Sequence, residues 1–152
     1  MISNYLGVTG EAWNNPPKAK ELALNQYRHG VEVIFAAAGN SGMGVFDAAA
    51  DQKKFAIGVD SNQNWMKPGF ILTSMLKRVD EAVFDSIKQF KDGKFTTGLT
   101  RYGVKSKGVD YAIDEHNQKL VSAEDKTKLE SLRAQIISGK IKVPDYYLSK
   151  KK

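Results

Sequence analysis

The feature that most constrains the fold is a pair of apolar segments that flank a glycine-rich turn. The first apolar segment, residues 31–38, leads into the turn at 39–44, and a short helical pattern follows over 45–50. The second apolar segment, residues 55–59, ends on Asp60. In open α/β sheets, ligands bind beyond the carboxyl ends of the strands. Both the turn and Asp60 are expected at such ends.

The residues before this unit continue the same alternation. Residues 2–6 are β-prone, residues 7–17 form a loop by composition, and residues 17–28 carry apolar side chains at helical spacing. Gly30 is placed to close that helix in the left-handed conformation. The first sixty residues therefore predict the order β-α-β-α-β, which favours an α/β fold with a parallel sheet.

After Asp60 the sequence predicts two further helices and three short strands. These are strands 70–73, 99–102 and 109–113, and helices 74–90 and 122–138. Ser74 is the expected N-cap of the first helix, which places Lys77 in its first turn. Ser122 and Asp125 have the spacing of a capping box. We expect one lobe over residues 1–144, followed by a basic tail at 145–152.

Composition excludes several classes of function. The chain of 152 residues has no cysteine, which rules out disulfides, thiolate metal sites and a cysteine nucleophile. Half of the net charge of +6 comes from residues 150–152, and the other basic residues alternate with acids, so no nucleic-acid partner is expected. No segment approaches transmembrane length and no signal peptide is visible, so the sequence as written indicates a cytoplasmic protein.

The glycine turn has two main interpretations. Gly39, Gly42 and Gly44 would let the backbone approach a small polar ligand, or would simply serve a tight strand-to-helix turn. A dinucleotide site is a weaker alternative, because the glycine order differs from G-x-G-x-x-G. Ser41 does not fit a nucleophile elbow, because Met43 stands where that motif has glycine.

Three other side chains are candidates for ligand binding. Asp60 could accept hydrogen bonds from a vicinal diol, or could cap a loop. Trp13 could stack on a planar ring, or could cover the sheet edge. Lys77 alone has the pattern of an ordinary surface lysine. No cluster of metal ligands is visible, and we expect neither a metal nor a cofactor.

Several separated motifs together resemble one family. They are the unit ending on Asp60, the segments at 72–80 and 136–144, and the opening with Asn4–Gly7 and Trp13–Pro16. In this order they are similar to the basic membrane protein (BMP) family of substrate-binding lipoproteins, the nucleoside receptors of ABC importers, of which the purine-nucleoside receptor is the type member.

The resemblance implies a Rossmann-like lobe of a type I periplasmic-binding-protein fold and a non-catalytic role. It implies that Trp13 stacks on the base, that Gly39 lies in a ligand-contacting loop, and that Asp60 and Lys77 bind the sugar hydroxyls. Asn40 stands where the family usually has glycine, so its side chain is expected at the cleft.

The resemblance covers only the second half of such a receptor. A ligand would therefore lie on an open face, and apolar surface that packs on the other lobe in a full receptor would be exposed. We expect a homodimer, with an ABC permease as partner only within a full receptor. The alternative is an interaction protein that dimerises through the vacated lobe interface and binds no ligand.

Overall fold

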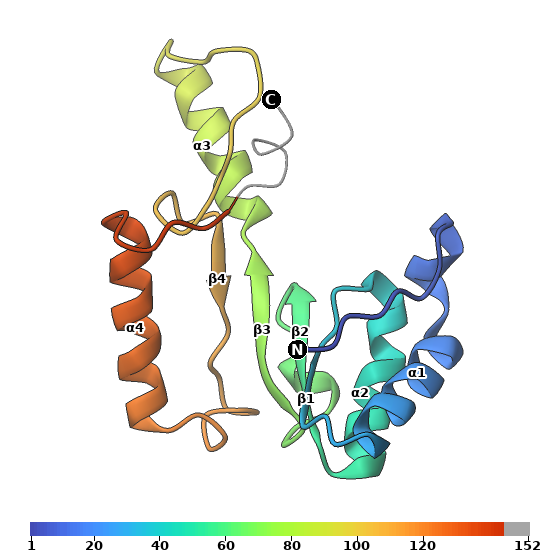
Figure 1. The fold of residues 1–152 in the computed structure, drawn as a ribbon. Coiled ribbons are helices and arrows are strands. Elements are labelled where there is room, and N and C mark those ends of the chain that lie inside the picture. The colour runs from blue at the N-terminus through green and yellow to red at the C-terminus, as the bar shows by residue number, and fades with distance from the viewer. Residues whose placement is uncertain (145–152) are drawn as a thin grey trace. The chain divides into compact units, whose positions relative to one another are not determined.

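The computed structural model describes residues 1–144, so the basic tail expected at 145–152 lies outside the described residues. The chain divides into two compact units (Figure 1). The first unit comprises residues 1–77 and 110–121, and the second comprises residues 78–109 and the chain from residue 122 onward. The first unit holds nearly all of the sheet, whereas the second holds the last two α-helices.

The sheet has four strands in the order β1-β2-β3-β4. They are β1 (Val33–Phe35), β2 (Phe55–Asp60), β3 (Ile71–Lys77) and β4 (Val109–Tyr111). The first three strands are parallel neighbours. Ala112 N donates to Ser74 O, and Arg78 N donates to Gly108 O, so β4 runs antiparallel to β3. The expected α/β fold is confirmed, and the sheet is mostly parallel, with β4 as its antiparallel strand.

Helix α1 (Pro16–Arg28) begins and ends on local signals. The Asn15 side chain accepts a hydrogen bond from Lys18 N at 3.1 Å, and Pro16 occupies the first turn, where its missing N–H costs nothing. Gly30, at a φ of 87°, lies just beyond the helix. These features confirm the predicted helix.

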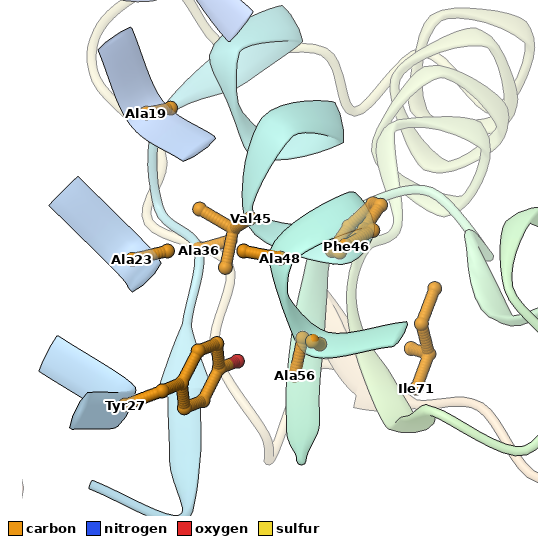
Figure 2. Close-up of a cluster of buried hydrophobic side chains, with 10 residues drawn as sticks. Ala19, Ala23, Tyr27, Ala36, Val45, Phe46, Ala48, Ala56 and Ile71 are labelled. Atoms are coloured by element: carbon orange, nitrogen blue, oxygen red, sulfur yellow. The ribbon is translucent and has the colours of Figure 1, made fainter. Parts of the chain in front are cut away.

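Helix α2 (Gly42–Gln52) packs against α1 and on β2 to form the core of the first unit (Figures 1 and 2). A side chain at Gly44 would overlap the carbonyl oxygen of Pro16, so glycine lets the two helices touch. Phe46 and Ile71 are the largest apolar side chains that are fully buried. The core is completed by Ala19, Ala23, Tyr27, Ala36, Val45, Ala48, Ala49 and Ala56.

The expected strand at residues 2–6 is wrong, because these residues form no regular secondary structure. Leu6 packs against the core, but the Ile2 and Tyr5 side chains are exposed, so the segment lacks the alternating buried face that favours a strand. A hydrogen bond of 2.8 Å from Gln26 Nε2 to Asn4 Oδ1 connects this segment to α1. Strand β1 is consequently the edge of the sheet.

The expected helix start at Ser74 is also wrong. Ser74 lies in the middle of β3 and is fully buried, because its hydroxyl bonds to the loop that precedes the strand. The strand continues to Lys77, which therefore ends a strand instead of starting a helix. Helix α3 (Val79–Lys91) begins two residues later, where Arg78 pairs with Asp80 in its first turn.

The second unit contains α3 and α4 (Ala123–Ile137). The capping box is confirmed, because Ser122 accepts from Asp125 N while the Asp125 side chain accepts from Ser122 N. The strand expected at 99–102 is wrong, since Gly98 has a φ of 121° and the chain there is irregular. Neither helix has a fully buried residue.

Candidate functional site

Two of the predicted site residues form an ion pair at the sheet edge. Asp60 ends β2 and Lys77 ends β3, and these parallel strands are neighbours, with Asp60 opposite Leu76. Lys77 Nζ lies 2.7 Å from Asp60 Oδ1, and the two side chains are 60% and 51% exposed. Such an exposed pair contributes only about 0–1 kcal/mol to stability. Its remaining oxygens and N–H groups can reach a ligand.

The predicted aromatic and the glycine turn are also brought together. Trp13 lies in the 3₁₀ helix η1 (Gly10–Asn14), and Gly39 opens the 3₁₀ helix η2 (Gly39–Ser41). Gly39 has a φ of 55°, and a Cβ atom there would lie 3.3 Å from Cε3 of Trp13. Glycine at this position therefore allows the backbone to lie against the indole. The indole is 60% exposed, which leaves ring surface for stacking.

Polar side chains tie these two short helices to each other. The Ser41 hydroxyl donates to Ala12 O and accepts from Asn15 N, both at 2.7 Å. Asn40 Nδ2 donates to Asn14 Oδ1 at 2.6 Å. Ser41 is thus a structural residue, and the Asn40 amide is held against the loop that carries the tryptophan.

A hollow of about 330 Å³ adjoins the tryptophan. It is lined by residues 4–10, Ala12, Trp13, Ala37 and Ala38. Its volume lies at the lower end of the range for small-molecule sites. Asp60 and Lys77 do not line it. The predicted residues thus form two groups, both near carboxyl ends of parallel strands.

Sequence reasoning missed a buried polar cluster behind Asp60. Asn64, Ser74 and Asn117 are fully buried, and Asn64 Nδ2 donates to Asp114 Oδ2 at 3.0 Å. Asn117 Nδ2 donates to Leu72 O at 2.8 Å. These bonds fasten the loop after β2 and the segment after β4 to β3. Each residue alone has the character of an ordinary loop residue, so the sequence offered no signal for the cluster.

The cluster also affects the ionisation of Asp114. Burial raises the pKa of its carboxyl, but hydrogen bonds from Asn62, from the His116 backbone and from Asn64 outweigh it and lower the pKa below its ordinary value. Asn62 makes the shortest of these bonds, at 2.6 Å. The carboxylate form therefore holds the loop together.

Other chemistries find little support among residues 1–144. No group of three His, Asp or Glu side chains there could hold a metal ion. The His29 ring lies 2.8 Å from Asn25 O within its own helix end, and the His116 ring lies 3.7 Å from the Glu115 carboxylate. None of the helices described is long and apolar enough for a membrane span.

A family model and individual relatives indicate the same protein family for this chain. Residues 5–146 match the family model described as ABC transporter substrate-binding protein PnrA-like. Basic membrane protein D of Borreliella burgdorferi is 34% identical over 148 residues, which are 95% of this chain and 42% of that protein. The ABC transporter nucleoside-binding protein BmpA of Lactococcus lactis is 34% identical over 152 residues, covering 88% of this chain and 42% of that protein.

A solved structure supports the same conclusion. The solute-binding protein of an ABC transporter system from Aeropyrum pernix superposes with a TM-score of 0.76 at 27% identity, over 94% of this chain and 48% of that one. The present chain thus spans less than half the length of these relatives.

Proposed function

Because this chain belongs to the family of PnrA-like ABC transporter substrate-binding proteins, we propose that it is a nucleoside-binding lobe without catalytic activity. The observation that carries the proposal is the exposed Asp60–Lys77 pair at the carboxyl ends of two parallel strands. The name of the Lactococcus lactis relative, a nucleoside-binding protein, supports the ligand class.

The chemistry of the pair suits a sugar. A carboxylate accepts hydrogen bonds from two adjacent hydroxyls, and an ammonium donates to a hydroxyl or ring oxygen. Asp60 supplies the acceptors and Lys77 supplies the donors. The exposed face of Trp13 would stack on a purine, and the Asn40 amide beside it would contact the base edge.

The family description also supports a partner and a location. A substrate-binding protein of an ABC transporter delivers its ligand to a membrane permease. We extend the partner and the location to this chain as part of the proposal. Its partner is an ABC permease, and it acts on the outer side of the membrane in which that permease lies.

The first test is calorimetric titration with inosine, guanosine and adenosine, beside the corresponding free bases. We expect nucleosides to bind more tightly than bases. Asp60→Asn should weaken nucleoside binding about 10- to 100-fold, the usual effect of losing hydrogen bonds to a charged acceptor. Absence of heat with every nucleoside at millimolar concentration would refute the proposal.

Asp51→Asn provides a matched control for this titration. Asp51 lies on α2 and pairs with Lys20 at 2.7 Å, with an exposure close to that of Asp60. The Asp51→Asn substitution removes the same charge as Asp60→Asn, but from an exposed ion pair outside the proposed site. Equal losses of affinity in the two variants would assign the effect to net charge instead of the site.

A second candidate function is supported by α3. The apolar face of this helix is exposed at Val83, Phe84, Ile87 and Phe90. A second copy of the chain could cover this surface, giving a homodimer that binds no ligand. The chain would then act as an interaction protein.

Sedimentation equilibrium separates the two candidates. An interaction protein should sediment as a dimer that ignores nucleosides, and Ile87→Lys should make it monomeric. Gln89→Lys, which adds the same charge to the polar face of α3, should leave the dimer intact. A wild-type monomer at all concentrations would exclude this candidate, whereas a dimer strengthened by nucleosides would favour the ligand-binding one.

A further inference from the structure

The backbone at Asp60 adopts a conformation that other residues must hold in place. Asp60 has a φ of 68°, and Ser61 N donates to Val59 O at 2.8 Å across it. A bond between residues two apart around a positive φ defines the rarer, strained kind of γ-turn. A residue other than glycine keeps such a conformation only when its surroundings impose it.

The Gln63 side chain supplies the main restraint. Its Oε1 accepts a hydrogen bond from Val59 N at 2.8 Å. Val59 is therefore fixed on both sides, with its carbonyl bonded to Ser61 and its amide bonded to Gln63. Strand β1 ends before this position, so in the part of the sheet described it offers Val59 N no acceptor.

Gln63 is itself anchored to β3. Its backbone N–H donates to Ser74 Oγ at 3.0 Å, and that buried hydroxyl donates to Asn64 Oδ1 at 2.8 Å. A Cβ atom at Gly58 would lie 2.8 Å from Gln63 Oε1 and 2.7 Å from Ser74 Oγ. The glycine thus leaves the space in which the glutamine reaches Val59.

The same anchors connect the two binding side chains. Ser74 lies on β3, three residues before Lys77, and Gln63 joins it to the turn that carries Asp60. A shift of this turn would move the Asp60 carboxylate relative to the ammonium that lies 2.7 Å away.

We propose that Gln63 is a positioning residue for nucleoside binding. It touches no ligand, but it holds the γ-turn that aims the Asp60 carboxylate at the position shared with Lys77. This inference rests on the proposed function for its effect on affinity. Its effect on the turn is independent of any ligand.

The test combines amide hydrogen exchange, followed by NMR, with calorimetry. Gln63→Ala should accelerate exchange at Val59 and Ser61 about 5- to 10-fold, as expected for the loss of one hydrogen bond. It should weaken inosine binding about tenfold while the thermal midpoint stays near the wild-type value. Gln63→Glu keeps an acceptor at the same position and should restore slow exchange at Val59.

Gln52→Ala is the matched control, because this glutamine lies exposed at the end of α2. It should change neither exchange at Val59 nor affinity. Unchanged exchange at Val59 in Gln63→Ala would overturn the inference, and so would faster exchange with unchanged affinity. If the wild type binds no nucleoside, the proposed function fails, and exchange alone decides whether Gln63 holds the turn.

Discussion

The two units of the chain differ in what their helices bury. In the first unit, α1 buries three residues and α2 buries six, around a core that includes Phe46 and Ile71. In the second unit, neither α3 nor α4 has a buried residue. Phe84 and Phe90 on α3 are exposed to 68% and 76%.

The difference shows what an amphipathic pattern specifies. The apolar stripe of α3 is as regular as that of α1, yet only α1 lies on a partner that buries its stripe. A pattern of period 3.6 predicts a helix with one face to cover, but it does not identify the covering surface. We therefore expect the first unit to provide most of the stability of the chain.

Paired phenylalanine substitutions give the largest expected effect. Phe46→Ala should cost about 3–5 kcal/mol of unfolding free energy, because it opens a cavity in a packed core. Phe90→Ala should cost at most about 1 kcal/mol of unfolding free energy, because it removes an exposed ring. That ring makes an edge-to-face contact with Phe95, at 6.3 Å between ring centres. Urea unfolding followed by circular dichroism measures both costs.

The same experiment can break the comparison. Equal costs for the two substitutions would mean that the α3 face is covered in solution, as the homodimer requires. Repeating the Phe90→Ala measurement at several protein concentrations would then show whether a second copy of the chain buries the α3 face. A cost that rises with concentration indicates a second copy, since the stability of a dimer depends on concentration.

The sequence was sufficient for features that depend on local signals. Apolar segments and turn-forming glycines, which lie within a few residues of each other, predict the strand, turn and helix that lead to Asp60. The cap at Ser122 is read from a side chain that bonds to backbone three residues away. The ligand-binding roles of Trp13, Gly39, Asn40, Asp60 and Lys77 stay predictions.

Features that depend on distant partners were not predictable. Ser74 looks like a helix cap, but partners ten and eleven residues away hold it inside a strand. Lys77 was consequently assigned to the wrong type of element, because it ends a strand beside Asp60 instead of starting a helix. Residues 2–6 have β propensity but expose Ile2 and Tyr5, and propensity alone does not form a strand.

The smallest expected effect concerns the capping box in the second unit. Hydrogen bonds from the Ser122 side chain and backbone lower the pKa of Asp125 below its ordinary value. Because the pKa is lower in the folded helix, the stabilisation is complete above the unfolded value of about 4 and is lost as the pH falls through the folded value. Acidification should therefore fray the first turn of α4.

Ser122→Ala should remove about 1 kcal/mol from the start of α4. Since neither α3 nor α4 has a buried residue that would spread this loss, the loss should appear as faster amide exchange at Asp125 instead of a shift in global unfolding. The variant should also weaken the dependence of this exchange on Asp125 protonation, because only the backbone N–H at position 122 still donates to the carboxylate. Ser131→Ala, in the middle of the same helix, should keep both the protection and its dependence on pH. A global loss of stability from Ser122→Ala would instead mean that the second unit unfolds together with the first. The two units would then differ in how many residues their helices bury, but not in stability.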